Sequence, residues 1–155
     1  MKSFENKIAV VTGGGTGMGR ELVLQLAKAN CNVSMCDVIE ENMDQTMDLA
    51  ISINPNVKIT KHVCDVSIKE QVEEFRDNVL SDQQSDSINL LFNNAGIGGG
   101  QSFIKSDIEE WEKVFAVCWY GVYHCSRAFM EALIKSDEGH LINTSSVNGF
   151  WASLG

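Results

Sequence analysis

A glycine-rich turn between an apolar run and an amphipathic segment constrains the fold of this chain more than any other feature. The run Lys7–Val11 leads into Thr-Gly-Gly-Gly-Thr-Gly-Met-Gly at positions 12–19, and apolar residues then recur with a helical period. Such a strand–turn–helix join lets backbone N–H groups approach a phosphate at the positive end of the helix. The spacing Gly13-x-x-x-Gly17-x-Gly19 does not match a P-loop NTPase. The turn therefore predicts a site for a dinucleotide or another phosphate ligand rather than a bare tight turn.

The alternation of strand and helix continues along the chain. Strands are predicted at 7–11, 31–36, 57–66, 88–92 and 140–144. The helices predicted between them include one that ends at Asn54-Pro55, one that a capping box at Ser67–Glu70 opens and that runs to about Leu80, and one that starts at Ser106–Glu109. This order predicts an α/β fold, a doubly wound parallel sheet with helices on both faces that stops after the fifth strand. Ligands of such sheets bind where the strands end.

Composition limits the number of domains and the classes of partner. The 155 residues are 44% hydrophobic, which suits one compact domain over 1–155 and is too little for two. With 12 Lys and Arg against 21 Asp and Glu, the net charge of −9 argues against nucleic acid or an anionic membrane as a partner. The sequence shows neither an apolar run of roughly 20 residues nor a secretory signal, so we expect a cytoplasmic protein without a membrane partner.

The cysteines and histidines are not spaced for disulfides or for a metal. The five cysteines are an odd number without a C-x-x-C pair, and the three histidines are scattered. We therefore expect no metal site, and small buried cysteines in a reducing compartment. Cys118 stands in the apolar stripe that runs from Ile108 to Phe129 of the last predicted helix, where a thiol is expected to be inert.

An acidic residue ends the second predicted strand. Asp37 lies 18 residues after Gly19, close to where dinucleotide-binding folds place an acid on the adenosine ribose. Its carboxylate would accept hydrogen bonds from both ribose hydroxyls and would repel a 2′-phosphate. The neighbours of Asp37 supply no cation, although Arg20 is near the turn. NAD is therefore expected as the cofactor in preference to NADP; the alternative role for Asp37 is a helix cap or a solvated loop acid.

Four segments together resemble the successive motifs of the short-chain dehydrogenase/reductase family. They are the turn at 12–19, Asp65 after the third strand, Asn-Asn-Ala-Gly at 93–96 and Gly-His-Leu-Ile-Asn-Thr-Ser-Ser at 139–146. The resemblance covers the whole chain. It implies a Rossmann-like NAD(P)-binding domain and the NAD(P)-dependent interconversion of a small alcohol and its ketone.

The resemblance also implies roles for individual residues. Those implied to contact the cofactor are Gly13, Thr16, Gly17, Met18 and Gly19 at the pyrophosphate and ribose, Asp65 and Val66 at the adenine, and Asn94, Ala95 and Gly96 along the cofactor and the sheet. Ser146 resembles the catalytic serine, which hydrogen-bonds the substrate oxygen.

The chain departs from the family pattern at two points. Where the family usually has Asn-x-x-Gly, this chain has Cys118-Trp-Tyr-Gly, so it lacks the amide of the proton relay. The family's general acid/base is a tyrosine in Tyr-x-x-x-Lys about a dozen residues beyond the serine, and this chain stops at Gly155, nine residues after Ser146. The only tyrosines, Tyr120 and Tyr123, precede the serine and have no lysine four positions on.

Two functional hypotheses follow from these departures. The first is that the chain is an incomplete and inactive part of an NAD(P)-dependent oxidoreductase of secondary alcohols and ketones. The alternative is a short form that binds a nucleotide, or regulates full-length relatives, without catalysis. For the full-length protein the resemblance implies a homo-oligomer. The aromatic residues at 119, 120 and 123 suit a partner surface and suit core packing equally, and Gly121 in mid-helix would admit another backbone.

Overall fold

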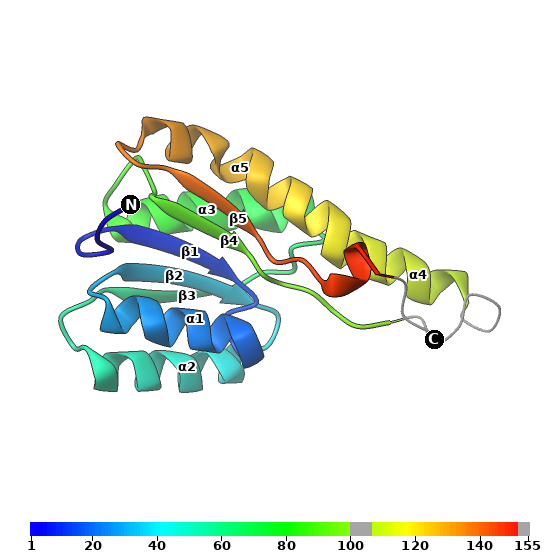
Figure 1. The fold of residues 1–155 in the computed structure, drawn as a ribbon, viewed down its shortest axis with the longest axis horizontal. Helices are drawn as coiled ribbons and strands as arrows, with labels where there is room; N and C mark the ends of the chain where they lie inside the picture. Colours follow the sequence, from blue (N-terminus) through cyan, green and yellow to red (C-terminus); the bar gives the residue numbers. More distant parts are fainter. Residues whose placement is uncertain (100–106, 152–155) are drawn as a thin grey trace.

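The computed structural model describes residues 1–99 and 107–151, which form a parallel sheet between two layers of helices (Figure 1). The five strands, in the order β3-β2-β1-β4-β5 across the sheet, are β1 (Ile8–Thr12), β2 (Asn32–Asp37), β3 (Ile59–Val63), β4 (Leu90–Asn93) and β5 (His140–Asn143). The helical segments are α1 (Gly17–Lys28), α2 (Glu40–Ile53), α3 (Lys69–Gln83), α4 (Ile108–Phe115), η1 (Ala116–Tyr120), α5 (Gly121–Lys135) and η2 (Val147–Gly149). The predicted α/β fold with a doubly wound parallel sheet is confirmed.

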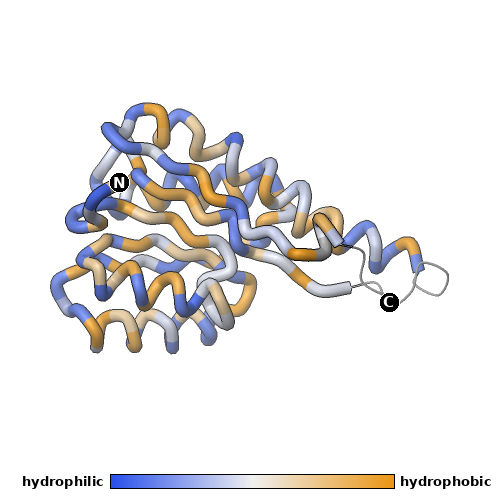
Figure 2. Tube along the Cα trace, viewed as in Figure 1, coloured by the Kyte–Doolittle hydropathy of each residue, from blue (hydrophilic) through white to orange (hydrophobic). Residues whose placement is uncertain are grey.

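Each face of the sheet carries its own hydrophobic core. Ala9 and Val11 of β1 pack on the side of α1 and α2, whereas Val10 packs with Phe75 of α3 and Phe129 of α5 on the other side. Figure 2 shows hydrophobic residues along the central strands and a mixture of hydrophobic and hydrophilic residues along the helices. A strand that is buried on both faces has no polar alternation, which explains why these strands read as continuous apolar runs.

The strand order creates a crevice at one edge of the sheet. β1 is central and pairs with β2 on one side and with β4 on the other, so the winding direction reverses between these neighbours. The loops that follow β1 and β4 therefore diverge to opposite sides at their carboxyl ends. A crevice at such a reversal is where ligands of open α/β sheets bind.

The predicted capping box at the start of α3 is wrong. The helix begins at Lys69, and the residue in the cap position is Ile68, whose side chain makes no cap hydrogen bond. Ser67 instead donates both its backbone N–H and its hydroxyl to Asp65 Oδ1, at 2.9 and 2.7 Å. The helix also continues to Gln83, past the end predicted at Leu80, before Gln84 takes a left-handed conformation.

The last predicted helix is a rod of three parts rather than one regular helix. α4 and α5 are joined through η1, a π-helical stretch, and Figure 1 shows α4 extending past the carboxyl ends of the strands. Only the later part of the predicted apolar stripe is buried, because the earlier part extends past the strands and has no sheet to pack against. Cys125 and Phe129 are in the core, whereas Phe115 is 53% exposed.

The cysteines agree with the prediction at four positions and not at the fifth. All five are free thiols; Cys31, Cys36, Cys64 and Cys125 are buried and Cys118 is exposed. Burial raises the pKa of Cys31 and of Cys125 to about 12, so both stay protonated and unreactive at neutral pH. Cys118 is exposed because it lies in η1, on the part of the rod that the sheet does not cover.

The described residues contain no helix that is both long and apolar enough to cross a membrane. Within the same residues, no group of histidine, cysteine and acidic side chains is placed to hold a metal ion.

Candidate functional site

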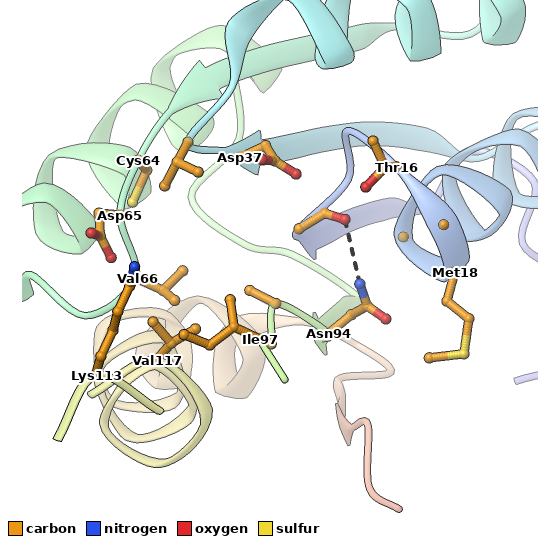
Figure 3. Close-up of a pocket in the computed structure, with 16 residues that line it drawn as sticks. Thr16, Met18, Asp37, Cys64, Asp65, Val66, Asn94, Ile97, Lys113 and Val117 are labelled. Atoms are coloured by element: carbon orange, nitrogen blue, oxygen red, sulfur yellow. Dashed lines mark hydrogen bonds between the residues drawn. The ribbon is translucent and has the colours of Figure 1, made fainter. Parts of the chain in front are cut away.

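A cavity of 610 Å³ opens at the carboxyl ends of β1, β2 and β4 (Figure 3). Its walls come from the glycine turn, the loop after β3, the loop after β4 and the α4–η1 rod. The residues that line it are Gly13, Thr16, Gly17, Met18, Gly19, Asp37, Val38, Cys64, Asp65, Val66, Asn94, Ala95, Gly96, Ile97, Lys113 and Val117. Every residue that the sequence predicted at the cofactor is therefore part of one cavity, although these residues come from four separate segments of the chain.

The three motif glycines of the turn are required for different physical reasons. Gly13 and Gly17 have φ angles of 69° and 54°, in the left-handed region that side chains disfavour. Gly19 has no such angle, but a Cβ at this position would lie 1.8 Å from the Gly13 carbonyl oxygen. No atom lies within 4 Å of a Cβ at Gly17, so that position faces open space at the start of α1. The turn thus leaves the amino end of α1 accessible from the cavity.

The amino end of α1 has the properties of an anion site. Thr16 occupies the cap position, and its side chain makes no cap hydrogen bond with the first turn. The first backbone N–H groups of a helix lack partners within the helix, and the helix dipole makes that end positive. A phosphate in the cavity would supply the missing acceptors.

The Thr12 hydroxyl holds the loop after β4 against the turn. Thr12 Oγ1 accepts hydrogen bonds from the backbone N–H groups of Asn94 and Ala95, both at 3.0 Å. It also donates to the Phe92 carbonyl at 3.3 Å. The Asn94 amide in turn donates to the carbonyls of Thr12 and Gly13, at 3.1 and 3.4 Å, which bridges the two loops (Figure 3). Asn94 therefore braces the cavity through its amide, and Thr12 does so without lining it.

Asp37 joins β2 to the glycine turn. Its Oδ2 accepts from the Gly15 N–H at 3.0 Å, and its Oδ1 accepts from the Ile39 N–H at 3.3 Å. The carboxylate lines the cavity beyond the turn. It is half-buried and is thus available to a ligand that enters from the side of α1.

Arg20 is not part of the cavity lining, and its side chain joins the glycine turn to α2. Its guanidinium donates to the Gly15 carbonyl at 2.6 and 3.0 Å, to Thr46 Oγ1 at 2.9 Å and to the Asn42 carbonyl at 3.2 Å. Thr46 is fully buried and also bonds the Gly15 carbonyl. The arginine nearest to the turn in sequence is therefore a structural group, and it does not line the cavity.

Asp65 and Val66 form the end of the cavity opposite to Met18 in Figure 3. Val66 is fixed from α5, where His124 Nδ1 lies 3.1 Å from its carbonyl oxygen. A Cβ at Gly121 would lie 2.6 Å from Val66 Cγ2, so the absent side chain of Gly121 makes room for Val66. This corrects the expectation that Gly121 admits a neighbouring chain: the close approach is made within the chain itself. The oligomeric state stays a prediction.

Two predicted residues lie outside the cavity lining. Ser146 follows β5 and is exposed, and it is not among the residues that form the cavity wall. Cys118 flanks the wall, because its thiol donates to the Ile97 carbonyl at 3.5 Å and Ile97 lines the cavity. The residues predicted to contact the cofactor are brought together, whereas Ser146 and Cys118 are not part of the cavity lining.

Sequence reasoning missed several lining residues. Val38, Ile97 and Val117 supply apolar walls, and Lys113 supplies a positive charge. Cys64 also lines the cavity, and the neighbouring Cys36 thiol lowers the pKa of Cys64. A helical spacing of four residues puts Lys113 on the same face as Val117, but no motif marks that face as a cavity wall.

Comparison with known proteins identifies the family. The family model of the short chain dehydrogenase matches residues 7–155. The chain belongs to the short-chain dehydrogenase family. Human epidermal retinol dehydrogenase 2 is 32% identical over 148 residues, which are 96% of this chain and 47% of that protein.

Solved structures of short-chain dehydrogenases share the fold. One from Burkholderia phymatum, in complex with NAD, is 32% identical with a TM-score of 0.91, and the match covers 99% of this chain and 53% of that one. A metagenomic short-chain oxidoreductase in complex with NADP is 28% identical with a TM-score of 0.84, and the match covers 94% and 64%. This chain spans about half the length of the curated relatives that it matches.

Proposed function

We propose that this chain is the cofactor-binding part of an NAD-dependent oxidoreductase that interconverts a secondary alcohol and a ketone. The observation that carries the proposal is the cavity at the reversal point of the sheet, which gathers the glycine turn, Asp37, Asp65 and Asn94. Its volume of 610 Å³ and its accessible helix end fit a dinucleotide. The family membership and the NAD-bound relative from Burkholderia phymatum support the same ligand class.

Each part of the cofactor has a matching wall. The pyrophosphate would lie on the N–H groups at the start of α1, where Gly17 leaves open space. The adenosine ribose would meet the Asp37 carboxylate, and the base would lie against Asp65 and Val66. The bound nicotinamide would accept or supply the hydride. The chain's own residues bind and orient the cofactor and exclude water from its adenosine half.

The choice of NAD over NADP rests on charge. A 2′-phosphate on the ribose would meet the Asp37 carboxylate, and the nearest arginine, Arg20, is engaged with Gly15 and α2. The relative from Burkholderia phymatum holds NAD and the metagenomic oxidoreductase holds NADP, so the family alone does not decide the choice.

The Asp37→Asn substitution tests this choice. The uncharged amide loses charge-assisted hydrogen bonds to the ribose, so we expect NADH to bind about tenfold more weakly. NADPH should lose less or gain, because the repulsion of its 2′-phosphate is removed. Fluorescence titration of NADH and NADPH gives both dissociation constants. Asp48→Asn, on the exposed face of α2, is the control with the same change of charge. NADPH binding as tight as NADH binding in the unsubstituted chain would contradict the proposal.

Ser146 and Cys118 belong to the catalytic half of the proposal. Ser146 would hydrogen-bond the substrate oxygen, and Cys118 stands where the relay asparagine is expected. Ser146 lies outside the cavity lining, so the cavity supports cofactor binding both in the oxidoreductase and in the alternative, a form that binds a nucleotide without catalysis. Incubation of the chain with NADH and a panel of ketones tests whether the chain catalyses the reaction by itself. NADH binding without oxidation is the result expected of a cofactor-binding part and of the non-catalytic form alike, and NADH oxidation above background would contradict both.

A further inference from the structure

Lys113 is the only lysine or arginine among the described residues that line the cavity. The other charged lining residues are Asp37 and Asp65. Lys113 lies on α4, is exposed, and forms no ion pair with any described residue. In Figure 3 its side chain extends from the rod toward the Asp65–Val66 segment and away from Thr16 and Met18. A cation thus stands at one end of the cavity, on the wall that faces the loop after β3.

The other groups at this end complement a purine base. Asp65 Oδ1 is engaged by Ser67, which leaves Oδ2 as an acceptor for an amino group. The Val66 N–H has no partner among the described residues and can donate to a ring nitrogen. The side chains of Val38 and Val117 supply apolar surface for the ring. A base in this position would meet an acceptor and a donor from one wall and the Lys113 ammonium from the other.

We propose that Lys113 positions the adenine base of the cofactor, by donating a hydrogen bond to a ring nitrogen and closing the base end of the cavity from α4. This inference rests on the proposed function and adds a residue to it. Lys113 acts on the base and not on the pyrophosphate, because the phosphate site is formed by the turn and the start of α1 at the other side of the cavity. Lys113 is therefore a positioning residue that sets affinity for the adenosine half.

The test compares ligands that share the base and differ in phosphate. Isothermal titration with adenosine, ADP and NADH is carried out on the unsubstituted chain, on Lys113→Met and on Lys113→Arg. We expect Lys113→Met to weaken all three ligands by the same factor, about tenfold. Lys113→Arg keeps the charge and the donor, and should restore binding to within about threefold. Lys28→Met, at the far end of α1, is the matched control and should change none of them.

The outcomes separate this inference from the proposed function. A loss confined to ADP and NADH, with adenosine unchanged, would place Lys113 at the phosphates and overturn the inference. Unchanged binding of all three ligands to Lys113→Met would overturn it as well and leave the proposed function standing. Failure of the unsubstituted chain to bind NADH and adenosine would overturn the proposed function together with the inference. Lys113 is exposed and forms no ion pair with a described residue, so equal melting temperatures should accompany the expected result.

Discussion

Substitution of Gly19 by alanine is expected to destabilise the chain by about 3 kcal/mol and to abolish NADH binding. The new Cβ would lie 1.8 Å from the Gly13 carbonyl oxygen and 2.7 Å from Asn94 Nδ2. The first contact is with backbone, which cannot turn aside as a side chain can. Alanine has a higher helix propensity than glycine by about 1 kcal/mol, which favours the variant. The cost of the clash between the new Cβ and the backbone is larger than this gain. Urea denaturation followed by circular dichroism measures the loss.

Gly17→Ala is the matched control for Gly19→Ala. At Gly17 the cost is conformational, about 1–2 kcal/mol for a left-handed residue, because no atom lies within 4 Å of the new Cβ. This variant should therefore fold. It should nevertheless bind NADH weakly, because the new methyl group would project into the space proposed for the pyrophosphate. If Gly19→Ala were no less stable than Gly17→Ala, the packing of α1 against the turn would not have the role assigned to it.

Substitution of Thr12 by valine is expected to cost about 2–4 kcal/mol, although the two side chains have nearly the same shape. Thr12 is 2% exposed, and its hydroxyl accepts from the N–H groups of Asn94 and Ala95. Valine leaves both part-buried N–H groups without an acceptor, at about 1–2 kcal/mol for each. The loop that they anchor lines the cavity, so NADH affinity should fall together with stability.

Thr12→Ser provides the contrast, since serine keeps the hydroxyl and loses only a methyl group, at about 1 kcal/mol. Denaturation curves of the two variants, with NADH titrations alongside, decide between packing and hydrogen bonding. A valine variant as stable as the serine variant would show that the hydroxyl is dispensable.

Local patterns located most of the fold and of the cofactor site. The glycine turn, the acid at the end of β2 and the Asn-Asn-Ala-Gly segment each stand at the end of an apolar run, and parallel strands bring such ends to one edge. Asp37 and Asn94 could be placed at the same cavity for that reason. The start of α3 was misread, because Ser67 was available both to a cap and to Asp65, and only the folded loop shows which partner it has.

Other features depend on which surfaces meet in space. The π-helical stretch that contains the exposed Cys118 leaves the spacing of apolar residues nearly unchanged. The periodicity of the sequence therefore does not predict this stretch. The mid-helix position of Gly121 suggests a contact with another chain, but in the structure the side chain of Val66 packs against Gly121. Arg20 could have faced a phosphate, and it faces the Gly15 carbonyl because α2 packs beside the turn.

By itself, the sequence determined the order of strands and helices, the parallel sheet and the edge at which the candidate cavity lies, because apolar periodicity and glycine turns are local properties of the chain. The tertiary structure alone decided which polar groups face the cavity and which hold it together. Thr12 and Arg20 show the difference: each is a polar side chain near the site, and its role depends on the partner that another segment brings to it. A hydrogen bond or an ion pair between distant segments has no spacing in the sequence from which it can be read.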